Sequence, residues 1–396
     1  MEKYKLINNT LGWIVCIIAS CVYLMTMEPT ASFWDCGEFI SSAYKLEVGH
    51  PPGAPFFMLT ANLFTQFASD PSTVAKMVNT MSALFSGLTI LFLFWSITHL
   101  AKKIVVEDAQ EITMGQTITI MGAGLVGALA YTFSDTFWFS AVEGEGYAYS
   151  SLFTALVFWL ILKWESVADA PHADRWIVLI AYLMGLSIGV HLLNLLCIPA
   201  IVLVYYYKKF PNPTMKGTLI ALLVSFVIIA LMMYGVVQGL VEICGYFELF
   251  FVNTLGMPYN SGVYVYVLVL AGVLIWSIWE TMRDEIHPLR LRISFLLSVI
   301  LIGIPFIGSG YVIAAILSIA LAAYLFMNKE LNLKLLNTIL ISLMVVVVGY
   351  SSYALTLIRA TADTPMNQNA PKDIFTLRTY LAREQYGQTP LLYGQT

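Results

Sequence analysis

Long apolar runs separated by short polar segments dominate this chain. A transmembrane helix needs about 20 predominantly apolar residues to cross the hydrocarbon core of a bilayer. Eleven segments approach this length, so the pattern predicts an all-α polytopic membrane protein with about eleven transmembrane helices. The expected spans are Thr10–Met27, Val78–Leu100, Ile118–Phe137, Tyr147–Trp164, Trp176–His191, Leu192–Tyr207, Thr218–Leu240, Tyr264–Met282, Ile293–Gly308, Gly310–Met327 and Leu335–Leu357.

One further apolar segment, Gly53–Ala68, is short and begins directly after Pro51-Pro52. Counting it as a span would reverse the direction of every later helix. We therefore expect an interfacial helix on the outer leaflet, where an amphipathic segment can bury one apolar face. The stretch Glu28–Met77 then forms one long outer loop.

The composition supports a membrane protein. Of the 396 residues, 59% are hydrophobic and only 11% are charged, compared with roughly 25% charged residues in soluble domains. The net charge of -4 gives no reason to expect nucleic-acid binding. The five cysteines form no CxxC pair, so their spacing suggests neither a zinc site nor a disulfide framework.

The basic residues indicate how the chain crosses the membrane, because cytoplasmic loops are enriched in Lys and Arg. The charged start Met1–Lys5 and the apolar run after it lack a cleavage site of the A-x-A kind, so we expect an uncleaved first span with a cytoplasmic N-terminus. This arrangement places 14 of the 20 basic residues inside. They are Lys3, Lys5, Lys102, Lys103, Lys163, Arg175, Lys208, Lys209, Lys216, Arg283, Arg290, Arg292, Lys329 and Lys334.

The chain becomes polar after the last apolar run. We expect residues 1–358 to form the transmembrane domain, with its first periplasmic loop at 28–77, and residues 359–396 to begin a periplasmic C-terminal region. The segment Leu391–Tyr393 resembles the opening of a strand, and we expect the natural protein to continue beyond it.

Asp35 and Glu38, three residues apart in the first outer loop, are the first candidates for chemistry. If Ser32 caps a short helix, both carboxylates lie on one face of that helix. One of them could then act as a general base. The alternative for Asp35 is structural, because Ser32-x-x-Asp35 also fits a capping box.

His50 precedes Pro51-Pro52-Gly53. Proline biases the residue before it towards extended geometry, which ends a preceding helix. The corner could aim His50 at a phosphate or a substrate hydroxyl. Alternatively, it is only a rigid turn with a histidine beside it.

Three further candidates lie outside in the same arrangement. Glu143 and Glu145 alternate with glycines before Tyr147, and glycine lets a backbone approach a ligand closely. His191 lies between two spans, where an intramembrane histidine suggests function. The structural alternatives are solvated loop acids and a histidine that bonds a free carbonyl at a helix end.

Arg359 closes the last span at its outer end. Arginine is suited to gripping a phosphate, although it can also anchor a helix at the interface. Carboxylates, histidines and an arginine gathered at the outer leaflet would suit a lipid-linked anionic substrate. The spans would hold the lipid tail, basic groups would hold the phosphate, and a carboxylate would activate an attacking hydroxyl.

Four motifs carry a resemblance to known proteins: Trp34–Phe39, His50–Pro55, Gly189–Leu193 and Arg383–Gly387. With the long first loop and the many spans, they resemble the GT-C glycosyltransferases. More narrowly, the chain is similar to a family of large membrane proteins common in Bacteroidetes, which in turn is similar to a vertebrate transmembrane protein O-mannosyltransferase.

The resemblance implies a polyprenyl-phosphate sugar donor and a protein Ser or Thr acceptor outside a bacterial inner membrane. It places Asp35 and Glu38 at the position of the catalytic acids, with Asp35 favoured as the base. His50, His191 and Arg359 would meet the phosphate charge, while Glu143, Glu145 and Tyr147 would bind substrate. The spacing Asp-x-Gly-Glu differs from the adjacent Asp-Glu pair of yeast-type enzymes, which leaves open which acid is the base.

Two other classes remain open. A transporter or lipid flippase could use outer acids to bind a cation, although transporters place charged sites near the midplane. A scaffold for envelope assembly would need the acids only structurally. A divalent cation held by Asp35, Glu38 and Glu143 is also conceivable, but we favour a metal-free site.

Overall fold

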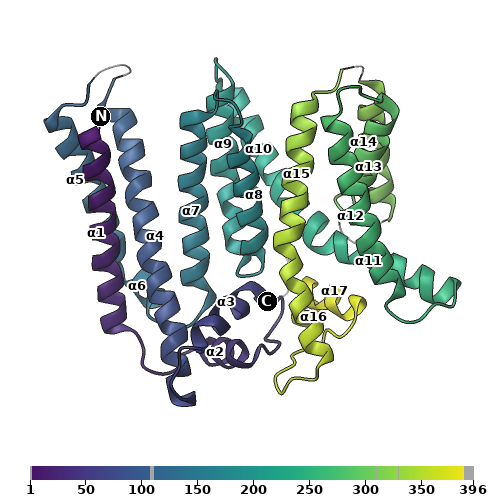
Figure 1. The fold of residues 1–396 in the computed structure, drawn as a ribbon, viewed down its shortest axis with the longest axis horizontal. Helices are drawn as coiled ribbons and strands as arrows, with labels where there is room; N and C mark the ends of the chain where they lie inside the picture. Colours follow the sequence, from purple (N-terminus) through teal and green to yellow (C-terminus); the bar gives the residue numbers. More distant parts are fainter. Residues whose placement is uncertain (1, 108–110, 308–310, 329, 388–396) are drawn as a thin grey trace. The chain divides into compact units, whose positions relative to one another are not determined.

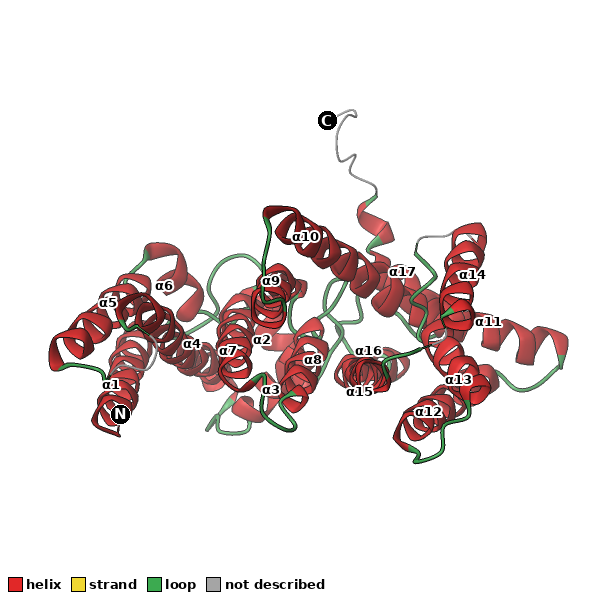
Figure 2. Ribbon diagram, turned by 90° about the horizontal axis from the view of Figure 1, so that it is seen from above, coloured by secondary structure: helices red, strands yellow, loops and turns green. Residues whose placement is uncertain are grey.

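The computed structural model describes residues 2–107, 111–307, 311–328 and 330–387. Every regular element in these ranges is a helix, as Figures 1 and 2 show, and the only strand-like pairing among them is an isolated bridge between Val48 and Asn367. The all-α polytopic architecture predicted from the apolar runs is therefore confirmed. Lys329 and the expected strand at Leu391–Tyr393 lie outside the described residues.

The chain divides into two compact units. One comprises Met1–Glu47 and Ala54–Ala221, and the other comprises Val48–Gly53 and Leu222–Thr396. The boundary between their main parts falls within α10 (Met215–Ala230).

The first unit is built around one long helix, α4, which packs against α1, α5 and α7. In Figure 1 these helices run side by side. The helices of this unit before α10 are α1 (Glu2–Thr26), α2 (Cys36–Lys45), α3 (Pro55–Thr65), η1 (Pro71–Thr73), α4 (Val74–Val105), α5 (Met114–Thr132), α6 (Asp135–Ala141), α7 (Gly146–Val167), α8 (Asp174–Ile188), η2 (Leu192–Cys197) and α9 (Ile198–Lys209).

The two ends of this unit differ in their chemistry. At the end that holds the N-terminus, Lys102 lies over the ring of Tyr4 at 5.6 Å, and Lys103 forms an ion pair with Glu165. At the opposite end lie α2 and α3, and there the backbone amide of Glu28 donates to Val142 at 3.0 Å. Basic groups and candidate acids therefore occupy opposite ends, as the threading of the chain predicted for this unit.

The second unit contains further apolar helices and a short polar segment at 48–53. Tyr380 donates to the Gly49 carbonyl at 2.6 Å, and Tyr353 donates to the Gly53 carbonyl at 3.2 Å. After α10, the helices are η3 (Leu231–Gly239), α11 (Leu240–Leu249), η4 (Phe250–Thr254), α12 (Ser261–Met282), α13 (Pro288–Leu301), α14 (Tyr311–Met327), α15 (Leu333–Tyr350), η5 (Ser351–Tyr353), α16 (Ala354–Thr361), α17 (Ile374–Ala382) and η6 (Glu384–Tyr386).

Eight helical segments in the described part of the chain are long and apolar enough to cross a membrane. Over its described residues, each of the eleven expected spans overlaps a helix, but α8, α13 and α14 have only 15, 14 and 17 residues. The count of eleven therefore stays a prediction. The helix α3 has 11 residues, too few to cross a bilayer, which agrees with leaving it out of the spans.

Local sequence explains several helix starts. Proline occupies the first turn of α3, α9 and α13, where its missing N–H costs no intrahelical hydrogen bond. Thr113 and Gln116 form a capping box at the start of α5. Within the spans, the apolar side chains leave the backbone no partner but itself, and the helix satisfies every internal N–H and C=O group.

Helix contact in the second unit depends on glycine at Gly239 and Gly303. A Cβ added to Gly239 would lie 2.3 Å from the carbonyl oxygen of Gly303, and Gly303 has a φ of +91°. The atoms that this Cβ would meet belong to the Gly303 backbone, which cannot rotate away as a side chain can. The two backbones therefore approach each other closely only because neither residue has a side chain.

We expect Gly239→Ala to lower the melting temperature of the purified protein in detergent, because overpacking of this kind typically costs about 1–3 kcal/mol. Gly272→Ala is the matched control, since a Cβ at that position of α12 meets nothing within 4 Å. Equal melting temperatures for the two variants would contradict the packing described here.

Candidate functional site

The acidic pair lies at the start of α2. The helix begins at Cys36, Asp35 occupies its N-cap position without a side-chain capping bond, and Glu38 lies in the first turn. The capping box considered as the structural alternative for Asp35 is not formed, because Asp35 is itself the N-cap residue and α2 starts three residues later than a helix capped by Ser32 would start. A turn closed by the Cys36 amide and the Phe33 carbonyl at 3.4 Å precedes the helix instead. Asp35 is exposed, and its side chain makes no capping hydrogen bond.

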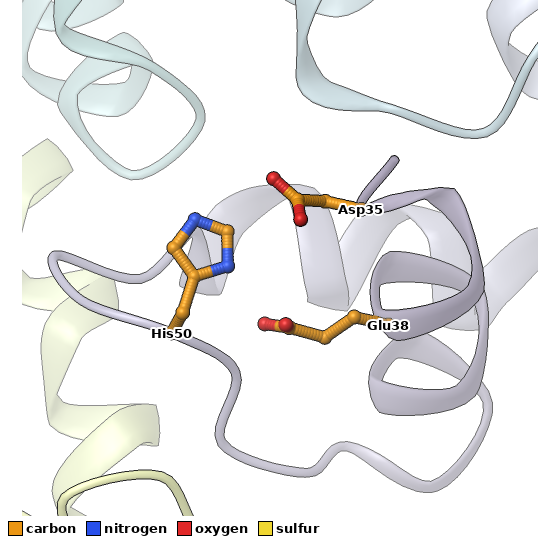
Figure 3. A group of neighbouring side chains, drawn as sticks. All are labelled: Asp35, Glu38 and His50. Atoms are coloured by element: carbon orange, nitrogen blue, oxygen red, sulfur yellow. The ribbon is translucent and has the colours of Figure 1, made fainter. Parts of the chain in front are cut away.

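Figure 3 draws Asp35 and Glu38 together with His50, which follows α2 in the chain. One carboxylate oxygen from each acid and one ring nitrogen of His50 lie within 4.8 Å of one another. The expectation of one Ser32-capped helix that carries both carboxylates on one face is wrong, because Asp35 precedes α2 and only Glu38 lies within it.

The corner that carries His50 differs in detail from the expectation. The preceding helix ends at Lys45, where Leu46 adopts a left-handed conformation with a φ of 49°. The Pro51-Pro52 bond, which is cis, therefore comes too late to end this helix. The Gly53 φ of +77° and the nearby Tyr380 hydroxyl, 2.7 Å from where a Cβ would lie, explain why glycine is required there.

Glu143 lies inside the first unit. Its side chain is only 2% exposed, and its Oε2 atom has no hydrogen-bond partner. One ligand atom each from Glu143, Glu145 and Cys36 lie within 4.8 Å of one another. Two acids expected to face solvent or substrate are thus grouped with a thiol at the start of α2.

Burial raises the pKa of the Glu143 carboxyl, and the negative charge of Glu28 raises it further, although hydrogen bonds from Ser32 and Cys36 act in the opposite direction. Burial also raises the pKa of the Cys36 thiol, and the charges of Glu143 and Glu145 add to this effect. The thiol therefore holds its proton at neutral pH when no cation is bound.

A buried asparagine fixes the position of this loop. Asn79 on α4 is fully buried, and its side-chain amide donates to the carbonyls of Glu28 at 2.7 Å and Thr30 at 3.0 Å. Glu28 in turn bonds Val142 through its backbone amide. The loop after α1 and the loop before α7 are thereby tied to the same helix.

His191 and Tyr147 meet at the neighbouring turn, with ring centroids 5.3 Å apart. His191 caps η2 by accepting a hydrogen bond from the Leu193 amide at 3.1 Å through Nδ1. The structural alternative was a His191 that bonds a free carbonyl at a helix end. The hydrogen bond observed instead joins His191 to a backbone amide, that of Leu193. Tyr147 is 44% exposed and can reach a substrate more easily than buried Glu143.

The start of α2, the loop before α7 and the turn before His191 adjoin one another within the first unit. A Cβ on Gly146 would lie 3.6 Å from the Val190 carbonyl and 3.9 Å from the Phe39 ring, so α2, the start of α7 and the turn before His191 meet there. Phe56 on α3 also donates to the Gly189 carbonyl at 2.8 Å. Arg359 lies in the last turn of α16 in the second unit, and its part in the site stays a prediction.

Sequence reasoning missed Cys36 and Asn79. Cys36 carried no spacing signal, because its neighbours Glu143 and Glu145 are more than a hundred residues away in the chain. Asn79 could have been noticed, since a polar amide at the start of an apolar span is expensive to leave without partners. The roles of the predicted site residues stay predictions.

The fold and this cluster define a class: a multi-pass, all-helical membrane protein with an acidic site at one end of its first unit. A family model described as "Protein O-mannosyl-transferase TMEM260 N-terminal domain" matches residues 35–214. This segment contains Asp35, Glu38, His50, Glu143, Glu145, Tyr147 and His191, and it leaves out Arg359.

Two curated proteins are similar to part of the chain. A protein O-mannosyl-transferase tmem260 from Dictyostelium discoideum is 26% identical over 196 residues, which is 47% of this chain and 22% of that protein. A protein O-mannosyl-transferase TMEM260 from Mus musculus is 27% identical over 184 residues, which is 46% of this chain and 24% of that protein. The match thus spans about a quarter of the length of these relatives. No solved structure is significantly similar to the chain.

We expect Gly144→Ala to destabilise the loop that carries Glu143. An added Cβ would lie 2.9 Å from Asn79 Oδ1 and 3.0 Å from Ile40 and Val78. Asn79 cannot move aside without breaking its two bonds to the first loop. A melting temperature lower by several degrees, measured in detergent, is the expected result.

Gly146→Ala is the matched control, because its Cβ meets only ordinary contacts at 3.6 Å and beyond. It should melt at the wild-type temperature or slightly above, since alanine favours the helix that begins there. If Gly144→Ala melted as high as Gly146→Ala, the close packing of the loop on Asn79 would be disproved.

Proposed function

We propose that this chain is the membrane-embedded part of a glycosyltransferase that moves a sugar to a hydroxyl, with protein Ser or Thr as acceptor. The observation that carries the proposal is the grouping of Asp35, Glu38 and the loop 142–147 at one end of the first unit. The similarity of residues 35–214 to a model named for a protein O-mannosyl-transferase supports both the reaction class and mannose as the sugar.

The proposed donor is a polyprenyl-phosphate-linked sugar. The apolar helices of the first unit offer a lipid-facing surface for a long isoprenoid chain, and a donor anchored in the bilayer presents its sugar at the membrane boundary. The acidic end would then be periplasmic, in a bacterial inner membrane, with the N-terminus in the cytoplasm. The distribution of Lys and Arg in the first unit supports this orientation.

The proposed chemistry is a direct displacement at the anomeric carbon. The acceptor hydroxyl oxygen forms the new bond to this carbon while the bond from the carbon to the phosphate oxygen breaks. Asp35, or alternatively Glu38, takes the hydroxyl proton, and the polyprenyl phosphate leaves with its electron pair. Asp35 suits a base because it is exposed and its carboxylate carries no capping bond.

Cationic groups would stabilise the leaving phosphate, as preorganised charges do for developing negative charge. We assign this task to Arg359, with His50 or His191 as helpers. Tyr147, being 44% exposed, is proposed to line the sugar or acceptor pocket together with Glu145. Glu143 is 2% exposed, so we propose that it acts on the substrate through its neighbours rather than by contact.

We expect Asp35→Asn to lower sugar transfer by about 10²–10⁴-fold, because a general base typically contributes that much. The amide has nearly the same shape but cannot accept the proton. Transfer would be measured with the purified protein, a radiolabelled polyprenyl-phosphate mannose and a Ser/Thr-rich peptide, with the melting temperature confirming that the variant folds.

Asp135→Asn is the matched control, since Asp135 is also an exposed aspartate at a helix start. It should transfer sugar at the wild-type rate. Near-normal transfer by Asp35→Asn would remove Asp35 from the role of base. If the wild-type protein instead moved lipid across liposome membranes without any sugar transfer, the proposed function itself would be wrong.

A further inference from the structure

Cys36, Glu143 and Glu145 form a second ligand group, separate from the side chains of Asp35 and Glu38. One ligand atom from each of the three residues lies within 4.8 Å of the other two. The thiol comes from the first turn of α2, and the carboxylates come from the loop before α7. All three belong to the first unit, so one folded body supplies the whole group.

One buried oxygen of this group lacks a hydrogen-bond partner, although the Glu143 carboxyl as a whole receives hydrogen bonds from Ser32 and Cys36. Cys36 is 0% exposed, Glu143 is 2% exposed, and the Glu143 Oε2 atom has no hydrogen-bond partner. Burying a carboxylate oxygen without a partner is costly, and buried charges are normally paired or bound to a metal.

We propose that Cys36, Glu143 and Glu145 bind a divalent zinc ion. A cation at their centre would neutralise the crowded negative groups and supply the partner that Glu143 Oε2 lacks. The thiolate ligand favours zinc over magnesium or calcium. Zinc accepts sulfur and carboxylate ligands together, whereas magnesium and calcium prefer oxygen ligands alone. Three protein ligands leave a fourth position for water or for a neighbouring oxygen.

The ion would fasten the beginning of α2 to the loop before α7. Asp35 directly precedes the ligand Cys36 in the chain, so the ion would fix the backbone that carries the proposed base. On binding, the Cys36 thiol loses its proton to solvent and its sulfur becomes a metal ligand, with no change of oxidation state. The proposed role of the ion is thus to position Asp35, and it requires no contact with the substrate.

Cobalt provides the test, because Co²⁺ occupies zinc sites and a thiolate ligand gives it an intense near-ultraviolet absorption. The detergent-purified protein would be stripped with a chelator and titrated with Co²⁺ alone. We expect one bound equivalent, a thiolate-to-cobalt absorption band, displacement by Zn²⁺ and no displacement by Mg²⁺. Absence of the band in the wild-type protein would overturn the proposal without reference to any variant.

Variants identify the ligands. Cys36→Ser should abolish the band, while Glu143→Gln and Glu145→Gln should weaken Co²⁺ binding by at least about tenfold, the scale on which even outer-shell partners act. Cys21→Ser is the matched control, because Cys21 is an exposed cysteine on α1 and should leave the spectrum unchanged. A band that survives Cys36→Ser, or binding that is unaffected by both glutamine variants, would overturn the proposed ligand set.

The measurement is independent of sugar transfer, so failure of the metal site and failure of the proposed function can be told apart. A protein that binds Co²⁺ through Cys36 but transfers no sugar would retain the metal site and lose the enzyme proposal. A protein that transfers sugar at full rate after chelation, and shows no thiolate band, would retain the enzyme and lose the metal site.

Discussion

The two hydrogen bonds from the Asn79 side chain are the interaction on which the arrangement of the acidic end depends. Asn79 is fully buried on α4, the helix against which α1, α5 and α7 pack. By donating to Glu28 and Thr30, it holds the loop after α1, and Glu28 then holds Val142. A buried amide that lost these partners would be destabilising by about 1–3 kcal/mol. The loop that carries Glu143 and the approach to α2 are therefore fixed from one rigid helix.

The same end concentrates negative charge in a small, partly buried volume. Asp35 is exposed, whereas Glu143 is enclosed beside Cys36, so neighbouring carboxylates have very different surroundings. Carboxylates in different surroundings can have different roles. An exposed carboxylate can exchange a proton with a substrate, and a buried one is suited to binding a cation. This division underlies both the proposed base and the proposed zinc ligands.

The similarity to the model named for an O-mannosyl-transferase falls almost entirely on the first unit, since residues 35–214 lie within it apart from the segment Val48–Gly53. The first unit thus contains most of the segment that this model matches. Its acidic end, rather than the apolar helices, is where a reaction could be specified, because apolar side chains supply lipid contact but no proton transfer. Arg359, from the other unit, lies outside this similarity.

The sequence by itself determined the all-α membrane architecture, the separation of basic and acidic ends in the first unit, and the omission of Gly53–Ala68 from the spans. These follow from local properties: the length of apolar runs, the position of charges and the presence of proline. Only the tertiary structure decided that Cys36 lies beside Glu143, that Asp35 rather than Ser32 is the N-cap residue of α2, and that Asn79 fixes the first loop. Hydropathy is a sum over neighbouring residues, whereas these contacts join residues that are distant along the chain. Helix packing and the hydrogen bonds of Asn79 and Glu28 bring them within a few ångströms.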